Sequence, residues 1–357
     1  MTIVSSHEYP ATRDRPRPWD GGRDAAVDLV RGIAVIFMVI AHVRVWAPTP
    51  PAPGKAALLV INNVASPLFA LIMGVSAGIV LTRARRPVTG TTFMLRNLVR
   101  GVALIAIGVG LEQLDTFVAI VLQSLGATLI VAAPLALLPA RVVAVVAVLA
   151  FVTGPVVNAA ARAGFDPARV YSEAWIDQVL QWIVLSTHYR VVSLLPFVLI
   201  GVVLARWGLT RRVAAGSFVV GLVAGVAVVG LWLTGTGIGR SEVVSGDLAD
   251  SLLDLALTGC AFGAIVLLAR WPRASSAITA MAPVRAVGAL ALTSYVLHVV
   301  LIAVVTRTVD WQSRAESWPL LAGGVLVGTV LACWMWWRLV GRGPVERLMA
   351  IPTDRIV

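Results

Sequence analysis

Asp28-Leu-Val-Arg31-Gly-Ile-Ala-Val-Ile-Phe-Met-Val-Ile-Ala-His42 places an arginine and a histidine inside an apolar run that reads as a membrane-spanning helix. Ionisable side chains are costly inside a bilayer unless they are paired or line a wet cavity, so these two residues are functional candidates. At about 100° and ~1.5 Å per residue, His42 returns to within roughly 20° of Arg31 and lies ~16 Å further along the helix. Asp28 precedes Arg31 by three residues, which lets the two pair.

The composition of the whole chain is that of a membrane protein. Of its 357 residues, 59% are hydrophobic and 13% are charged, against about 25% charged in soluble domains, and the mean hydropathy is +0.89. Windows of about 20 apolar residues predict an all-α polytopic integral membrane protein with about ten transmembrane helices in one bundle. The expected spans are 26–46, 57–81, 97–114, 117–138, 141–160, 190–206, 213–234, 249–269, 286–306 and 319–337.

The pattern divides the chain into three segments. Residues 1–25 form a polar tail rich in Pro and Arg that we expect to be disordered, 26–337 form the transmembrane domain, and 338–357 form a second polar tail. An even number of spans leaves both tails on one side, where most arginines lie. The positive-inside rule therefore predicts cytoplasmic termini in a multi-pass plasma-membrane protein. Residues 1–25 lack an apolar h-region, so no cleavable signal peptide is expected.

The distribution of charge and the positions of the cysteines argue against nucleic-acid binding and against a metal site. The net charge of +11 is scattered over short loops, which favours a topology signal over nucleic-acid binding. The two cysteines, Cys260 and Cys333, both fall in apolar spans. Because they have no metal-ligand spacing, no metal is expected.

Polar residues in the second span form one group of candidates. Asn62, Asn63 and Ser66 open this span, and Ser76 lies ten residues further along. Such residues can serve tight helix packing through small side chains. The alternative is a polar wall beside His42, which would make these four residues candidates for a substrate pocket.

The third span and the residue just before it carry two arginines and a carboxylate. Arg96 can snorkel to lipid phosphates, whereas Arg100 lies deeper and is the better candidate to bind an anionic ligand. Glu112 is twelve residues beyond Arg100, which brings it to about the depth of His42. A carboxylate there could accept a proton from the imidazole, or it could be an interfacial acid at a helix end.

The ninth span adds a second intramembrane histidine. His298 follows Ser294 by four residues and Tyr295 by three, so it shares a helix face with Ser294. A lone histidine in a helix is more often structural, but two in one bundle favour a functional role. His188, in the outer loop before the sixth span, we interpret as incidental.

The order of several motifs resembles the transmembrane acyltransferases, the group that includes heparan-α-glucosaminide N-acetyltransferase. Asp28-x-x-Arg31-Gly-x-Ala34, Met38 and His42 look like the first helix of that family, in its bacterial branch. The related type 3 membrane O-acyltransferases carry Arg-x10-His in their first helix, with the spacing of Arg31 and His42. Further similar stretches occur at 67–76, 95–108, 292–295 and 341–346.

This resemblance implies transfer of an acyl group, by default acetyl, from cytoplasmic acyl-CoA to a sugar or cell-envelope glycan at the outer side. Cations near the cytoplasmic face suit the phosphates of CoA, which makes Arg31, Arg96 and Arg100, with Asp28, candidates for donor binding. His42, with Glu112, would act as general base or carry the acyl group as an acyl-imidazole. The acceptor pocket would be lined by Asn62, Asn63, Ser66, Ser76, Ser294, Tyr295 and His298. Membrane lipids are the other expected partners, and a homo-oligomer is left open.

Two other classes remain open. The same ionisable residues would suit a transporter or flippase for an anionic lipid-linked or glycan precursor, with His42 and Glu112 as a proton relay. A structural subunit of an envelope complex is the third alternative. Transport predicts internal repeats and paired broken helices, and the sequence shows no strict repeat, so acyl transfer is favoured.

Overall fold

The structure is a computed structural model that describes residues 23–83, 88–166, 168–169, 172, 174–234, 245–354 and 356. Most of the N-terminal tail, for which we predicted disorder, lies outside these residues. The described residues are mostly helical and contain no strand. The main helices are α1 (Ala25–Val43), α2 (Ala52–Arg83), α3 (Gly90–Glu112), α4 (Leu122–Leu135), α5 (Ala140–Gly164), α7 (Val191–Trp207), α8 (Arg211–Thr234), α9 (Leu248–Ala269), α11 (Ala282–Ala289), α12 (Ala291–Thr308), α14 (Trp318–Leu339) and α15 (Pro344–Asp354).

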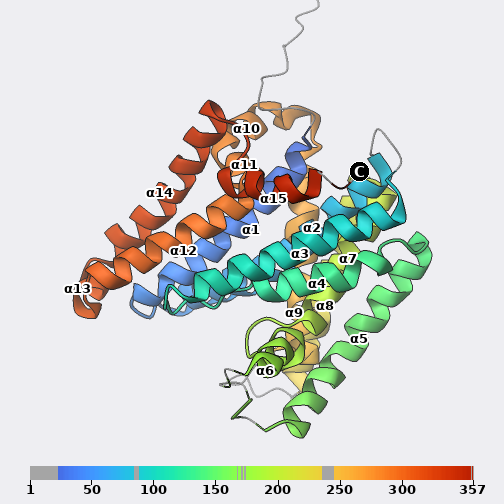
Figure 1. Cartoon of the computed structure of the whole chain (residues 1–357), viewed down its shortest axis with the longest axis horizontal. Helices are drawn as coiled ribbons and strands as arrows, with labels where there is room; N and C mark the ends of the chain where they lie inside the picture. Colours follow the sequence, from blue (N-terminus) through green and yellow to red (C-terminus); the bar gives the residue numbers. More distant parts are fainter. Residues whose placement is uncertain are drawn as a thin grey trace, which may run out of the picture.

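Short segments connect these helices at the two ends of the bundle. They are η1 (Arg44–Trp46), α6 (Trp175–Leu180), the π-helical η3 (Gln181–Leu185), η4 (Pro272–Ala274), α10 (Ser275–Ala280) and α13 (Trp311–Glu316). In Figure 1, α6 lies at the lower end, α13 at the left-hand edge and α10 at the upper end. Segments that lie across the ends of a bundle fit the water–lipid interface, where amphipathic pieces settle.

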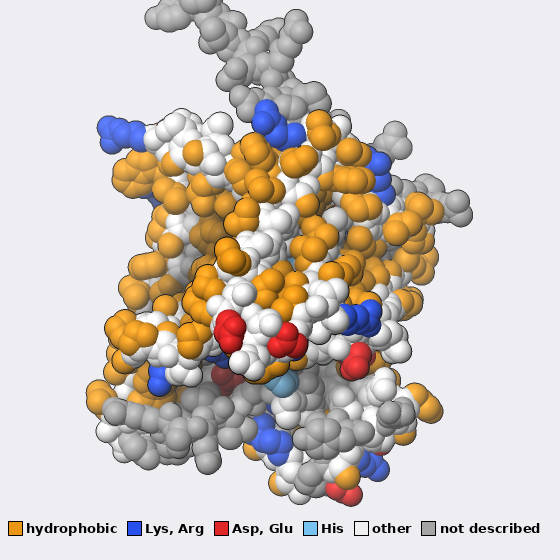
Figure 2. Space-filling model, turned by 90° about the vertical axis from the view of Figure 1, so that its left-hand side faces the viewer, with side chains coloured by type: hydrophobic (Ala, Val, Ile, Leu, Met, Phe, Trp, Pro, Cys, Tyr) orange, Lys and Arg blue, Asp and Glu red, His pale blue; other side chains and the backbone are white. Residues whose placement is uncertain are grey.

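The helices confirm an all-α polytopic membrane protein. In the described part of the chain, eight helices are long and apolar enough to cross a membrane, and α4 and α7 are shorter apolar helices. An apolar helix lies within each of the ten predicted spans, and the ninth is divided into α11 and α12 at Leu290. Figure 2 shows hydrophobic side chains over most of the height of the molecule, with Lys and Arg gathered towards its ends.

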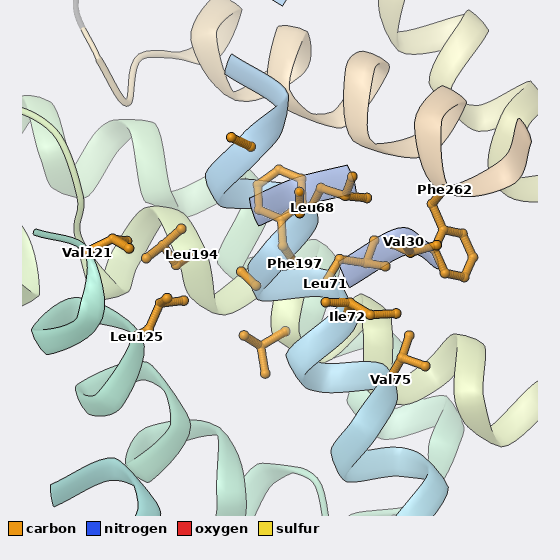
Figure 3. Close-up of a cluster of buried hydrophobic side chains, with 14 of the residues drawn as sticks. Val30, Leu68, Leu71, Ile72, Val75, Val121, Leu125, Leu194, Phe197 and Phe262 are labelled. Carbon is orange, nitrogen blue, oxygen red and sulfur yellow. The ribbon is translucent and has the colours of Figure 1, made fainter. Parts of the chain in front are cut away.

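The core forms around α1, α2 and α7. Figure 3 shows Leu68, Leu71, Ile72 and Val75 of α2 facing one cluster of buried side chains with Phe197 of α7. Without a hydrophobic drive between helices in lipid, close packing through small residues brings helices together. A Cβ on Gly201 of α7 would lie 2.0 Å from the backbone oxygen of Leu71.

Close packing at glycine residues also joins α1 to α11. A Cβ on Gly32 would lie 2.1 Å from the backbone oxygen of Val284, and one on Gly288 would lie 1.8 Å from that of Asp28. The two helices therefore touch along their backbones at the level of Asp28 and Arg31. This contact fixes the start of α1, the helix that also carries His42.

The two ends of the described chain lie at the same end of the bundle (Figure 1). Asp24 caps α1 by accepting from the backbone N–H of Ala26 and also pairs with Arg270 at the end of α9. At the start of α3, Arg96 donates to the carbonyl of Ile356, at 2.8 Å from Nη2. The segment after 338, which the sequence analysis treated as a polar tail, contains the rest of α14 and the whole of α15.

Candidate active site

Two histidines from distant helices form a hydrogen-bonded pair inside the bundle. Nδ1 of His42, in the last turn of α1, lies 3.1 Å from Nε2 of His298 on α12. The ring planes differ by 7° and the ring centroids are 5.3 Å apart. The other nitrogen of His298, Nδ1, lies 3.1 Å from the carbonyl oxygen of Ser294.

This arrangement determines the tautomers of a neutral pair. A carbonyl oxygen only accepts hydrogen bonds, so Nδ1 of His298 carries a proton and its Nε2 is an acceptor. Nδ1 of His42 must then donate to that acceptor. The lone pair of His42 consequently lies on Nε2, for which the described part of the chain offers no hydrogen-bond partner.

The ring of His298 is held by its surroundings. The residue is fully buried, and Tyr295 packs edge-on against it with ring centroids 5.1 Å apart. The hydroxyl of Tyr295 accepts from the backbone N–H of Val121 at 3.2 Å. Oγ of Ser294 lies 2.9 Å from Sγ of Cys333 on α14, so this buried serine joins two helices and lies behind the histidine pair.

His42 lies at the inner end of an open cleft. A cavity of about 160 Å³ is lined by His42 together with Met38, Asn62, Ser66 and Tyr189, among others. A larger cleft of about 750 Å³ shares part of this lining, including Asn62, Ser66 and Tyr189. Figure 2 shows a hollow towards the lower end of the molecule in which a histidine side chain is visible. Because His42 lines the smaller cavity, a ligand that occupies this cavity can reach its unprotonated nitrogen.

The cleft has a mixed polar wall. Asn62, Asn63 and Ser66 of α2 line it on one side, and Asp250 and Asp254 of α9 line it on another. These side chains offer several acceptors and donors that match hydroxyl, amine or amide groups of a ligand. The lining also contains two cations, Arg44 near the end of α1 and Lys55 near the start of α2.

Arg190, which precedes α7, is the most deeply buried cation of the cleft. Only 3% of its surface is exposed, and its Nη2 donates to Oγ of Ser245 at 2.8 Å. Burial, with Arg162 nearby, lowers the pKa of Arg190 to about 10, so the side chain stays cationic at neutral pH. Burial also raises the pKa of the neighbouring Tyr189, which keeps this phenol protonated.

A glycine turn holds this wall together. Gly246 has φ +81°, and its backbone N–H donates to the carboxylate of Asp250 at 2.6 Å. Its carbonyl accepts from the side chain of Asn158 at 3.0 Å. A Cβ at this position would lie 2.5 Å from Nη2 of Arg190. The turn therefore needs glycine both for its backbone conformation and for the space beside Arg190.

Arg31 lies at the opposite end of α1 and links three helices. Its Nη2 donates to Oγ of Ser76 on α2 at 2.6 Å, and its Nη1 donates to the carbonyl of Gly288 on α11 at 3.2 Å. The carboxylate of Asp28 is 3.7 Å away and also accepts from Arg23 at 2.7 Å. Ser76 is therefore a neighbour of Arg31, remote from the cleft at His42.

The structure separates the remaining candidates. Arg96 and the half-buried Arg100 lie on α3, which begins at the end of the bundle where Ile356 lies. Glu112 is exposed at the last residue of α3, and among the described residues no hydrogen bond joins it to His42. The partner of His42 is His298 instead, a residue that the sequence analysis assigned to the acceptor pocket.

Several residues of the cleft escaped the sequence analysis. His188, interpreted there as incidental, lines both the cleft and the inner cavity, as does Tyr189. Asp250 and Asp254 fall four residues apart within a predicted span, and intramembrane carboxylates are functional candidates by the same reasoning as Arg31. That signal was present in the sequence. The approach of the loop at 187–190 to α2 was not, because it depends on how α7 packs.

Fold and site together define a polytopic helical membrane protein that presents an imidazole lone pair at the inner end of a polar cleft. Residues 23–232 match a family model described as heparan-alpha-glucosaminide N-acetyltransferase, catalytic. The chain belongs to this family of transmembrane acyltransferases, since the match covers more than half of it. Residues 201–351 also match a model described as a protein of unknown function (DUF418). None of the curated proteins matches the chain.

Proposed function

We propose that this protein transfers an acyl group, by default acetyl, from cytoplasmic acyl-CoA to a sugar or cell-envelope glycan at the outer face of a bacterial plasma membrane. Membership of an acetyltransferase family supports acyl transfer. The observation that carries the proposal is the lone pair on Nε2 of His42, held by His298 at the inner end of the cleft. The positive-inside pattern supports cytoplasmic termini, and with that orientation the cleft would open at the outer face.

The chemistry has two routes that use the same lone pair. In direct transfer, Nε2 of His42 takes the proton of an acceptor hydroxyl or amine, which attacks the thioester carbonyl. The C–S bond breaks, and the proton passes to the CoA thiolate. In the second route Nε2 itself attacks the thioester carbonyl, the C–S bond breaks and CoA leaves as the thiolate. The acceptor then attacks the acyl-imidazole, the C–N bond breaks to restore the lone pair of Nε2, and the acceptor's proton passes to the CoA thiolate. In both routes the bond from Nδ1 of His42 to His298 stabilises the positive charge that develops on the ring.

The donor would enter at the other end of α1. Arg31, with Asp28, and the arginines Arg96 and Arg100 of α3 supply fixed cations for the phosphates of CoA, and guanidinium groups suit phosphate geometry. About 16 Å of helix separates Arg31 from His42, so the flexible pantetheine arm would carry the thioester inward. With a site that spans this distance, the donor and the acceptor would bind at opposite faces of the membrane.

Binding of acetyl-CoA to the purified protein, measured by calorimetry, tests the proposal without knowledge of the acceptor. We expect saturable binding in wild type and in His42→Ala, and loss of binding in Arg31→Ala. The second measurement follows radiolabelled acetyl into total envelope glycans and lipids, where His42→Ala should show no transfer. Failure of wild type to bind any acyl-CoA would refute acyl transfer and make transport of an anionic precursor the working hypothesis.

Matched variants separate binding from folding. Ser76→Ala removes the hydrogen bond of Arg31 to α2 but keeps the charge, so it should retain acetyl-CoA binding if the charge is what matters. Arg273→Ala removes an exposed arginine from η4 and should leave binding unchanged. Loss of binding in Ser76→Ala as well would assign the effect of Arg31 to helix packing.

A further inference from the structure

A second, apolar groove adjoins the cleft. It lies between α8 and α9, which pack along each other, and has a volume of about 490 Å³. Its lining consists of Gly, Ala, Val, Leu, Trp and Cys side chains without a charged group. Val226 and Val229 of this lining are exposed, so the groove opens towards the side of the bundle that faces lipid.

The groove and the cleft are neighbours that share part of their walls. Trp232 and Leu253 line both of them. On one side of these two residues lie the carboxylates Asp250 and Asp254, and on the other lie Gly225 and Ala256. Tryptophan prefers the boundary between hydrocarbon and headgroups, and Trp232 stands two residues before the end of α8. A polar compartment therefore meets an apolar one at the expected membrane surface.

The depth of the groove matches one leaflet. On α8 it extends from Gly221 to Trp232, which at ~1.5 Å per residue is ~16 Å. The hydrocarbon core of a bilayer is about 30 Å thick, so the groove reaches from the cleft-side surface to about its middle. Gly225 leaves room along α8 where a side chain would otherwise fill the space, whereas Gly221 lets α9 approach closely, since a Cβ there would lie 2.6 Å from the backbone nitrogen of Cys260.

From this shared wall and the depth of the groove we infer that the acyl acceptor is a lipid-anchored glycan, with its sugar headgroup in the cleft and its hydrocarbon chain in the groove between α8 and α9. The identity of this ligand as acceptor rests on the proposed acyl transfer, whereas its binding does not. The hydroxyls of a sugar match the amide and carboxylate groups of the cleft. The chain brings the headgroup to the cleft from within the membrane, and His42 lies at the inner end of that cleft.

Photolabelling tests the binding directly. The protein in phosphatidylcholine nanodiscs is irradiated with a dodecyl glucoside that carries a diazirine in its chain, and labelled peptides are mapped by mass spectrometry. We expect labels in 221–232 and 253–260, displaced by unlabelled dodecyl glucoside and not by methyl glucoside. A diazirine phosphatidylcholine should label these segments no more than other exposed helices.

The variants Gly225→Leu and Gly230→Leu form a matched pair. A Cβ on Gly225 would meet only Cβ of Ala256, at 3.7 Å, so leucine fits there and its side chain fills the groove. Gly230, also on α8, has open space around it and does not line the groove. Labelling should fall about tenfold or more in Gly225→Leu and stay at the wild-type level in Gly230→Leu.

Equal labelling of both variants, or labelling spread over all lipid-facing helices, would overturn the inference and leave only ordinary surrounding lipid. Acetyl transfer to methyl, octyl and dodecyl glucosides then separates the two proposals. A rate that rises with chain length in wild type but not in Gly225→Leu supports both. If the groove is labelled but no glucoside is acetylated, acyl transfer to sugars is refuted and binding of the lipid-anchored glycan is not. If the transfer rate does not depend on chain length, the lipid anchor is refuted and acyl transfer is not.

Discussion

Nδ1 of His42 and Nε2 of His298 lie 3.1 Å apart although the two residues are separated by 256 positions in the chain. Packing of α1 against α12 creates this contact, and the carbonyl of Ser294 behind it fixes which nitrogen carries which proton. Nucleophilic and general-base catalysis use this arrangement, in which a second group orients the base. In this protein the orienting group is a neutral ring, so the pair adds no net charge to the bundle.

Replacement of His298 should therefore lower turnover while it spares donor binding. His298→Leu removes the acceptor for Nδ1–H of His42, and we expect acetyl transfer to fall about 10²-fold, within the range that acid–base catalysis contributes. His298→Gln retains an acceptor oxygen and should recover part of this loss. Acetyl-CoA affinity by calorimetry should be unchanged in both. Equal activity of the leucine variant and wild type would remove His298 from the mechanism.

Glu346 of α15 should stabilise α12 through the first turn of that helix. Its carboxylate accepts from the backbone N–H groups of Leu292 and Thr293 at 2.9 and 3.1 Å, which have no partner within the helix. We expect Glu346→Ala to lose about 1–3 kcal/mol in the free energy of unfolding, read as a lower thermal midpoint in detergent. Glu316→Ala, an exposed carboxylate on α13, is the control and should leave that midpoint unchanged.

Much of the fold could be predicted from the sequence because membrane spans are long apolar runs. All ten predicted spans contain an apolar helix, including the short α4 and α7. The break of the ninth span at Leu290 was not predicted, because the residues from Ala286 to Leu292 are all small or apolar. The break lies two residues after Gly288, whose contact with the backbone of Asp28 joins distant parts of the chain. Local periodicity does not report such long-range contacts.

The candidate site shows the same limit. The helix periodicity and depth of Arg31 and His42 follow from their spacing alone, and the pairing of Asp28 with Arg31 was anticipated. Depth alone, however, made Glu112 a candidate partner for His42, whereas the observed hydrogen-bond partner is His298. Two residues at one depth meet only if their helices are neighbours and their faces converge, and a single sequence specifies neither.

The glycine turn beside Arg190 predicts a separable effect on the acceptor. Gly246→Ala places a Cβ against Arg190 and Asn158 and also forces alanine to φ +81°. We expect the KM for the acceptor to rise about tenfold or more, because the displaced turn carries Asp250 and the cleft wall with it. The control is Gly341→Ala, since Gly341 has φ +87° with open space around it. That variant should lose only the backbone term of about 1–2 kcal/mol and keep its KM.

The contact of α1 with α11 predicts a large stability effect from one methyl group. A Cβ on Gly288 would lie 1.8 Å from the backbone oxygen of Asp28, so in Gly288→Ala the two backbones must separate. Overpacking of this kind costs about 1–3 kcal/mol, and it also removes the carbonyl of Gly288 from Arg31. We therefore expect a lower thermal midpoint together with weaker binding of acetyl-CoA.

Gly230→Ala is the matched control on an exposed helix face. Its added Cβ has no neighbour within 4 Å, and alanine favours a helix over glycine by about 0.5–1 kcal/mol. The midpoint of this variant should therefore stay the same or rise, with acetyl-CoA affinity unchanged. A Gly288→Ala protein as stable as wild type would contradict the close backbone contact. A Gly288→Ala protein that is unstable but binds acetyl-CoA with wild-type affinity would separate Arg31 from donor binding.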